Sequence, residues 1–278
     1  MKRASIKTLL TLLCLSGAAA LAQSPAQITP LINAHAHNDY EHTRPLLDAL
    51  DCGFCSVEAD VWLVDGRLLV AHELKVVRKE RTLQSLYLEP LRERVEKNRG
   101  RVYPNGPTLT LLIDFKSSAT ETYQAFRVAI KPYEKMLTAF YPDRKEERAV
   151  TIIISGNRPL QFPESESVHY AGVDGRLTDI NSAASPLFMP LISENWAKAF
   201  KWKAQGPIPA AEKTKLKDLA AKAHEKGKRI RFWNIPNSPV AWKELQDAGV
   251  DLINADNLTG LRDFLLANGA QKTGPQPK

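Results

Sequence analysis

The sequence predicts a single-domain α/β protein, a (β/α)8 TIM barrel in a regular or distorted form. Eight short apolar segments alternate with longer amphipathic ones along the chain. About 250 residues are left once an N-terminal leader is set aside, which is a typical length for one such barrel. Polar side chains follow the apolar segments at the same relative place, where the catalytic groups of a barrel lie. These three observations together favour the barrel.

The predicted strands are short, rich in Val, Ile, Leu and Phe, and bounded by turn residues. Their apolar runs are nearly continuous, which is typical of parallel strands covered on both faces. They comprise residues 31–35, 55–61, 109–115, 149–155, 168–173, 187–192, 229–233 and 250–255. An open, doubly wound sheet is the main alternative. No G-x-G-x-x-G motif follows the first strand, so the dinucleotide-binding form of that fold has no support.

Helices are expected between the strands, and several end at a recognisable stop signal. They comprise residues 43–51, 82–98, 120–141, 210–226, 239–248 and 258–267. Gly227 follows the fourth and Gly249 follows the fifth. Glycine is the commonest residue just past a helix end, so both positions indicate a helix stop. Residues 62–73 predict a β-hairpin instead, since Asp65-Gly66 is a strong two-residue turn signal.

The first 22 residues predict a secretory signal peptide. Lys2, Arg3 and Lys7 form a basic stretch, an apolar run follows, and 20-ALA-22 fits a cleavage site. The run is too short for a stable membrane span and has the wrong flanks. An uncleaved N-terminal anchor is the alternative. The expected location is therefore periplasmic or secreted.

The predicted organisation is a signal peptide over 1–22, the barrel over 23–267 and a disordered polar tail over 268–278. Loss of the three leader cations would lower the formal net charge from +7 to +4. The remaining Lys and Arg are scattered, with no aromatic-interleaved stripe, so nucleic-acid binding is not expected. A modest positive charge would help to attract an anionic substrate.

Cys52 and Cys55 form a C-x-x-C pair. Redox dithiols of this type favour the turn from a strand into a helix, whereas this pair lies between a predicted helix end and a strand. Buried small residues or a structural disulfide are therefore favoured over redox catalysis. Two cysteines alone also make a weak zinc site, because structural zinc usually has four ligands.

Glu58 and Asp60 are expected to project together into the barrel mouth, because residues two apart in a strand share a face. Without a cation, two adjacent carboxylates repel each other and one takes up a proton. A hard divalent cation, Ca²⁺ or Mg²⁺, removes that conflict and prefers oxygen ligands. Asp114 follows another apolar run and is a candidate third carboxylate. Solvated acids on an exposed strand and a strand-end salt bridge of Asp114 are the alternatives.

Three of the six histidines, His35, His37 and His72, lie at predicted strand or hairpin ends. Soft ligands are scarce in this sequence, so these imidazoles suit proton transfer better than zinc binding. One histidine on each side of a phosphate would supply a base for the nucleophile and an acid for the leaving oxygen. A cation between them would neutralise charge on the phosphoryl oxygens.

Two further side chains are candidates for substrate binding. Lys116 shares a strand face with Asp114 and would lie beside the carboxylates. Trp233 ends a late strand, where its ring either stacks on a polyol or sugar part of the substrate or packs at the barrel rim.

The motifs 35-HAHNDY-40 and 57-VEADVWLVDGRLLVAH-72 together resemble the phospholipase-C-like phosphodiesterase superfamily. That superfamily includes glycerophosphodiester phosphodiesterases and phosphatidylinositol-specific phospholipases C. With 111-LLIDFK-116, 232-FWNIPN-237 and 249-GVDLINADNL-258, the resemblance is strongest to the altered-inheritance-of-mitochondria protein 6-like branch. The motifs span residues 31 to 258, and the E-x-D pair, the hairpin with Asp-Gly and the histidine that follows are specific as a set, in that order.

The resemblance implies a distorted barrel with one divalent cation in its mouth. Glu58 and Asp60 match the metal-binding E-x-D pair and His72 matches the second catalytic histidine. The eukaryotic phospholipases C end their first strand with a catalytic His and a metal-binding Asn, which His37 and Asn38 match. Alignment with the H-R-G of bacterial glycerophosphodiesterases makes His35 catalytic instead. Neither histidine is followed by Arg-Gly, and Asp114 stands where the family usually has Glu.

The resulting expectation is a secreted, metal-dependent phosphodiesterase with Ca²⁺ or Mg²⁺. Its substrate would be a small-molecule or lipid-headgroup phosphodiester of the glycerol or inositol type, cleaved by two-histidine acid–base catalysis. One alternative is a sphingomyelinase-D-like lyase that releases a cyclic phosphate. The other is a metal-binding envelope protein without catalytic activity. No nucleic-acid partner and no stable membrane span are expected.

Overall fold

The computed structural model describes residues 28–163 and 166–269. The predicted signal peptide and residues 270–278 of the predicted tail lie outside these described residues. Within the described ranges, no helix is both long enough and apolar enough to cross a membrane.

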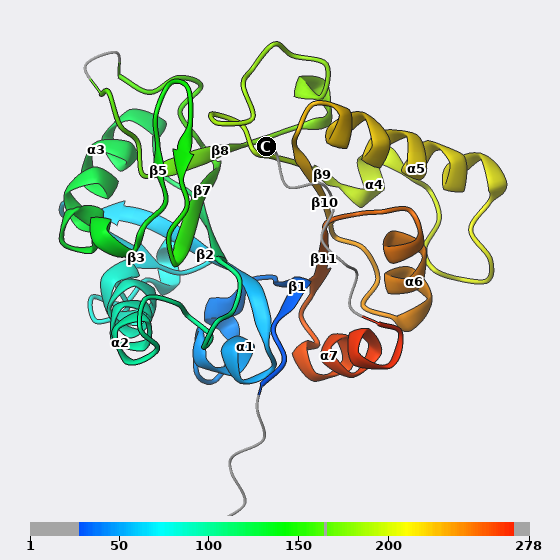
Figure 1. The fold of residues 1–278 in the computed structure, drawn as a ribbon, viewed down its shortest axis with the longest axis horizontal. Coiled ribbons are helices and arrows are strands. Elements are labelled where there is room, and N and C mark those ends of the chain that lie inside the picture. Colours follow the sequence, from blue (N-terminus) through cyan, green and yellow to red (C-terminus); the bar gives the residue numbers. More distant parts are fainter. Residues whose placement is uncertain (1–27, 164–165, 270–278) are drawn as a thin grey trace, which may run out of the picture.

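Eight parallel strands close into a barrel, with a helical layer around most of it (Figure 1). Each strand pairs with the next, and β1 pairs with both β11 and β2, which closes the ring. The barrel strands are β1 (Leu31–Ala36), β2 (Phe54–Val64), β4 (Leu109–Phe115), β7 (Val150–Gly156), β8 (Ala171–Gly175), β9 (Leu191–Asn195), β10 (Arg229–Trp233) and β11 (Leu252–Ala255). The predicted (β/α)8 barrel is confirmed, and every predicted strand overlaps an observed one.

The predicted hairpin is also present. β3 (Arg67–Val70) runs antiparallel to the end of β2. Asp65 and Gly66 have φ values of 49° and 74°, and a type I′ turn needs positive φ at both central residues. Asp-Gly is a preferred pair at such turns, so the local sequence explains the hairpin. It carries the chain back so that His72 follows β3 near the barrel mouth.

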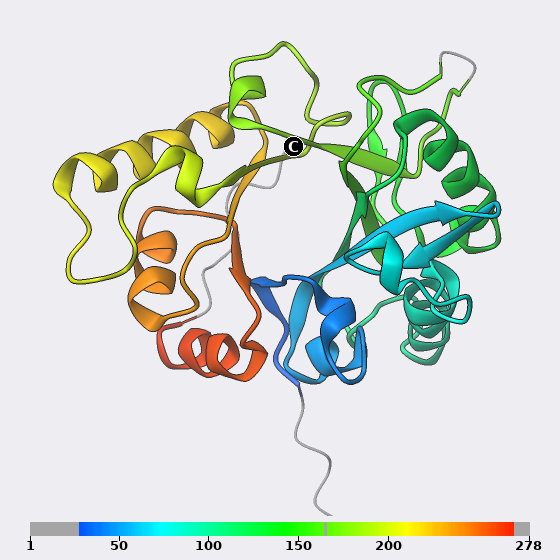
Figure 2. The ribbon, with the colours of Figure 1, turned by 180° about the vertical axis from the view of Figure 1, so that it is seen from behind.

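The surrounding helical segments follow most of the strands and leave one side less regularly covered (Figure 2). They are η1 (Asp39–Glu41), α1 (Leu47–Asp51), η2 (Leu74–Val76), η3 (Gln84–Leu88), α2 (Glu89–Lys97), α3 (Ala119–Ile130), η4 (Lys131–Met136), η5 (Leu177–Asp179), α4 (Trp196–Ala199), α5 (Ala210–Glu225), α6 (Pro239–Asp247) and α7 (Leu258–Ala267). In the described part of the chain no helix joins β7 to β8, and only the short η5 joins β8 to β9. The barrel is therefore distorted on that side.

The single helix predicted over residues 120–141 is wrong in its second half. α3 ends at Ile130, and a 3₁₀ turn containing Pro132 follows. Proline has no N–H to donate to the preceding turn, so it interrupts the helical bonding. The chain then joins a small two-stranded sheet, β5 (Ala139–Phe140) with β6 (Lys145–Glu146). The apolar residues Ala139 and Phe140, which the sequence placed on a helix face, are therefore part of a strand.

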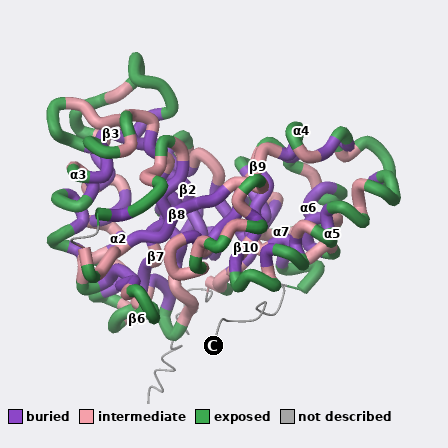
Figure 3. The backbone as a smooth tube through the Cα atoms, turned by 90° about the horizontal axis from the view of Figure 1, so that it is seen from above, coloured by how far each residue is buried: buried purple, intermediate pink, exposed green. Residues whose placement is uncertain are grey.

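Most of the hydrophobic core lies between the strands and the helices, and buried residues line the strands in Figure 3. Inside the barrel, four fully buried apolar side chains form a separate cluster: Leu112, Ile153, Leu191 and Leu252. Side chains two apart on a strand share a face, so Thr110, Leu112 and Asp114 follow one another along the interior face of β4. The interior therefore has polar groups at both ends of the barrel.

Candidate active site at the barrel mouth

Three carboxylates converge at the carboxyl-terminal ends of β2 and β4. Glu58 and Asp60 are two positions apart on β2, so their side chains lie on the same face of the strand. Asp60 is directly opposite Asp114 of β4 in the parallel register. One oxygen from each of the three lies within 4.8 Å of the others. Glu58 and Asp60 are buried, and Asp114 is partly exposed. The structure thus brings together the three acids that the sequence marked as candidate metal ligands.

Asp60 has a carboxylate whose two oxygens are in different situations. Oδ2 accepts a bond from the Tyr40 hydroxyl at 2.7 Å and lies 3.0 Å from Lys116 Nζ. Oδ1 is buried and has no hydrogen-bond partner among the described residues. A buried carboxylate oxygen without a partner is costly. A divalent cation bound by the three acids would satisfy it, so the donor set fits a hard metal ion.

Two acids of the cluster, Asp114 and Asp60, hold protons more strongly than isolated acids do. Burial raises the pKa of Asp114 to about 6, and the nearby charges of Asp60 and Glu58 add to the rise while Lys116 opposes it. Burial and the Glu58 charge also raise the pKa of Asp60. Burial lowers the pKa of Lys116, but Asp114 and Asp60 outweigh this and raise it. This mutual repulsion is the conflict that a bound cation relieves.

Arg231 keeps Glu58 ionised from within the barrel. Its Nη2 lies 2.7 Å from Glu58 Oε2, and its Nε donates to Asn254 Oδ1 at 2.8 Å. Burial raises the pKa of Glu58, but Arg231, His35 and His37 together outweigh it and hold that pKa well below its usual range. Sequence reasoning missed this residue, because nothing local to β10 indicates that its side chain meets β2 on the other side of the barrel.

His35 lies beneath the carboxylates rather than in the open mouth. Its Nδ1 is 2.7 Å from Ser56 Oγ and its Nε2 is 3.2 Å from Glu58 Oε2. The side chain is fully buried, and burial together with the Arg231 charge lowers its pKa to about 3. His35 is therefore neutral near pH 7, and both ring nitrogens are engaged. The geometry suits it to orienting Glu58.

His37 is exposed to the mouth and paired with a carboxylate. Its Nδ1 lies 2.7 Å from Asp256 Oδ1, which Asn237 also positions through a 2.7 Å bond to Oδ2. Burial lowers the pKa of His37, but the bond to Asp256 and the charges of Glu58 and Asp256 together outweigh it, so the net shift is upward. The bond leaves Nε2 as the ring nitrogen directed to other partners. Sequence reasoning assigned no role to Asp256, because its pairing with His37 joins opposite ends of the chain.

His72 and Asn38 meet the same cluster through the Tyr40 hydroxyl. His72 Nδ1 is 3.0 Å from Asp60 Oδ2 and 3.2 Å from the Tyr40 oxygen, and more than half of its side chain is exposed. The hydroxyl is also 2.9 Å from Asn38 Oδ1. Asn38 has a positive φ of 46°, a conformation that Asn tolerates better than most residues. Burial and Asp60 raise the pKa of Tyr40, so it stays protonated.

The remaining predicted residues have different surroundings. Lys116 lies between two of the acids, 3.0 Å from Asp60 Oδ2 and 3.3 Å from Asp114 Oδ1. Trp233 is half-buried at the mouth end of β10, on the strand face that also carries Arg231.

Cys52 and Cys55 are buried free thiols, and burial raises the pKa of Cys55 to about 12. Such a thiol is unsuited to redox catalysis.

Comparison with known proteins identifies the family of this chain. Residues 23–170 match the AIM6-like phosphodiesterase domain. This chain belongs to that family. The AIM6-like relatives include Altered inheritance of mitochondria protein 6 of Eremothecium gossypii, which is 30% identical over 90% of this chain and 74% of its own length. The homolog from Arthroderma benhamiae is 30% identical over 84% of this chain and 83% of its own length.

A solved structure supports the fold of this AIM6-like domain. The crystal structure of a glycerophosphodiester phosphodiesterase from Parabacteroides distasonis superimposes with a TM-score of 0.51 and 17% identity. The match covers 87% of this chain and all of that one. At this identity the likeness shows the barrel fold alone. Family and fold together support a phosphodiester-cleaving role.

The expected periplasmic or secreted location is wrong on the evidence of the AIM6 relatives. They are named for altered inheritance of mitochondria, which points to a mitochondrial or intracellular role rather than an extracellular one. The error has a physical origin. A basic leader with an apolar run suggested secretion, but mitochondrial targeting segments are likewise basic and poor in acidic residues. Composition therefore does not separate the two destinations.

Proposed function

We propose that this protein is a metal-dependent phosphodiesterase that cleaves glycerol- or inositol-type phosphodiesters by two-histidine acid–base catalysis. One observation carries the proposal. Three carboxylates from two strands converge at the barrel mouth, and one buried oxygen of Asp60 has no hydrogen-bond partner among the described residues. His72 lies beside Asp60, and His37 follows the neighbouring strand β1. Lys116 and Arg231 offset part of the negative charge of the three acids, and a bound divalent cation would offset the rest and give that Asp60 oxygen a partner.

Glu58, Asp60, Asp114 and Asn38 would hold the cation. All four offer oxygen atoms, which suits Ca²⁺ or Mg²⁺. When bound, the cation would supply charge neutralisation for the phosphoryl oxygens. The ammonium of Lys116, which is already beside two of the acids, would bind a phosphoryl oxygen on the same side. Trp233 would contact the polyol part of the substrate.

The hydrogen bonds of the two histidines suggest opposite roles. His72 Nδ1 donates to Asp60, which leaves a basic Nε2 that would accept the proton of the attacking hydroxyl. His37 has a raised pKa because of Asp256, so its protonated form would donate to the leaving oxygen. The substrate hydroxyl beside the phosphate would form the new P–O bond as the leaving alcohol departs. Water would then open the cyclic phosphate, with the two imidazoles exchanging roles.

The test is a phosphodiester panel assayed with Ca²⁺, with Mg²⁺ and with EDTA. Glycerophosphocholine and glycerophosphoinositol are suitable first substrates, and phosphorus NMR identifies the products. We expect His72→Ala and His37→Ala each to lower kcat by roughly 10²–10⁴-fold, the usual contribution of a general acid or base. Glu73→Gln is the matched control, because this exposed acid adjoins His72 but pairs with Lys75 at the surface.

The possible results separate this function from its rivals. Unchanged turnover in both histidine variants would reject the mechanism. A cyclic phosphate that accumulates without hydrolysis would identify a lyase. Cation binding with no turnover across the panel would indicate a metal-binding protein without catalytic activity.

A further inference from the structure

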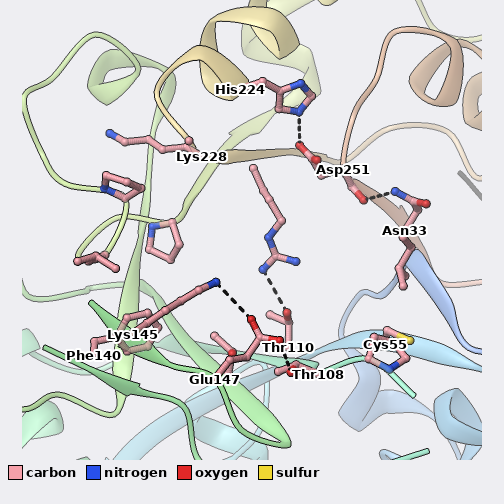
Figure 4. A pocket seen from close by; sticks show the side chains of 18 residues that line it. Asn33, Cys55, Thr108, Thr110, Phe140, Lys145, Glu147, His224, Lys228 and Asp251 are labelled. Carbon is pink, nitrogen blue, oxygen red and sulfur yellow. Dashed lines mark hydrogen bonds and ion pairs between the residues drawn. The ribbon is translucent and has the colours of Figure 1, made fainter. Parts of the chain in front are cut away.

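A second cavity lies at the opposite, amino-terminal end of the barrel, with a volume of about 260 Å³ (Figure 4). Thr110 and Thr151 line it from β4 and β7. Two residues later on the same strands, Leu112 and Ile153 belong to the fully buried apolar cluster inside the barrel. Asp114 of the acidic site follows Leu112 by two more residues. The apolar layer therefore separates this cavity from the proposed active site.

Arg229 is the unusual residue of this cavity. It begins β10, and its Nη2 donates to Thr110 Oγ1 at 3.1 Å, the dashed line that reaches Thr110 in Figure 4. Burial lowers the pKa of its guanidinium, and the charges of Asp251 and Glu147 oppose that shift from a longer distance. No carboxylate of the described residues is within ion-pairing distance of it, in contrast to Arg231, which contacts Glu58 directly. Its side chain keeps some exposure because it borders the cavity.

The two acids that line the cavity are already engaged. Asp251 Oδ2 lies 2.8 Å from His224 Nε2, and Glu147 Oε2 lies 3.3 Å from Lys145 Nζ (Figure 4). The lining nevertheless holds three cations, Lys145, Lys228 and Arg229, against these two acids. A lining with excess positive charge attracts an anion, and an anion in the cavity would give Arg229 a direct ion-pair partner.

We propose that this cavity binds a small organic carboxylate, which pairs with Arg229 through both of its oxygens. The planar guanidinium fork matches a carboxylate in this way. A singly charged ligand fits better than a phosphate dianion, because the carboxylates of Glu147 and Asp251 also face the cavity. Apolar lining residues would contact the rest of the ligand: Ile32, Phe140, Pro186, Leu187 and Pro190.

The size of the cavity limits the ligand. An engineered cavity of about 150 Å³ holds benzene, so a volume of this kind accommodates roughly ten non-hydrogen atoms. Benzoate and benzamide are therefore a matched pair of probes, since they have nearly the same shape and differ in charge. Isothermal titration in EDTA keeps a metal-bound active site from contributing to carboxylate binding.

We expect the wild-type protein to bind benzoate roughly tenfold more tightly than benzamide, the effect of a charge-assisted bond. Arg229→Met should remove this preference. Arg229→Lys keeps the charge but not the fork, and should retain only part of it. The lysine variant also provides the decisive comparison if the methionine variant does not fold. Lys116→Met, which removes a cation from the opposite end of the barrel, should bind benzoate normally.

Three results would overturn the proposal. The first is equal affinity for benzoate and benzamide in the wild-type protein. The second is benzoate binding that Lys116→Met abolishes and Arg229→Met preserves, which would place the ligand in the active site. The third is inorganic phosphate binding more tightly than benzoate, which would contradict the choice of a monoanion.

Discussion

Replacing Arg231 by methionine tests whether one buried ion pair stabilises the acidic site from within the barrel. Arg231 and Glu58 are both nearly fully buried, with 2.7 Å between Nη2 and Oε2. Removing the guanidinium leaves a buried carboxylate without its strongest partner. Loss of one member of such a pair costs about 3–5 kcal/mol. We expect Arg231→Met to lower the free energy of unfolding by that amount.

The assay is denaturant unfolding in EDTA, carried out as a double-mutant cycle with Glu58→Met. Replacing both members by apolar side chains removes the uncompensated charge, so the double variant should be more stable than the two single changes predict. Adding Ca²⁺ or Mg²⁺ to Arg231→Met should recover part of its stability, because a cation bound to the folded state stabilises it. Single-variant effects that add within about 0.5 kcal/mol would refute the coupling.

Three further predictions concern the mouth of the barrel. Asp256→Asn removes the carboxylate that raises the pKa of His37, so that pKa should fall and the corresponding limb of the pH–rate profile should move to lower pH. NMR titration of the His37 imidazole checks the assignment, and a limb that does not move would contradict it. Gly156→Ala should lower both stability and cation affinity, since a Cβ there would lie 2.0 Å from Asp114 Oδ1 at a positive φ of 65°. The control is Gly66→Ala, which has a similarly positive φ but no atom within 4 Å of the added Cβ, and it should keep its cation affinity when titrated in parallel. Removal of divalent cations with EDTA should abolish turnover and lower Tm, and re-addition should restore both; full activity in EDTA would exclude a metal mechanism.

Local patterns in the sequence predicted the parts of the fold that depend on neighbouring residues. The alternation of Glu58 and Asp60 placed both carboxylates on one strand face, and Asp65-Gly66 predicted the hairpin. The same kind of reasoning failed over residues 120–141. There the apolar spacing suggested one helix, but the chain after Pro132 joins a small sheet instead. Tertiary pairing overrode the local preference.

The choice between the two first-strand histidines shows why the site needed coordinates. His35 and His37 alternate on the same short segment, and their sequence context left both open. In the structure His35 is enclosed between Ser56 and Glu58, whereas His37 reaches the mouth and meets Asp256. Burial and partner, not residue type, separate a positioning imidazole from one that is available for proton transfer.

The sequence by itself determined the barrel, the order of its strands and the acids that follow them, because strand periodicity and turn chemistry act over a few residues. Only the tertiary structure decided which distant groups meet. Asp256 reaches His37 across 219 positions, and Arg231 reaches Glu58 across 173. The position of Arg229 in a cavity at the far end of the barrel is equally invisible in the sequence. Such pairings depend on how the closed sheet aligns its strands, and no local pattern encodes that alignment.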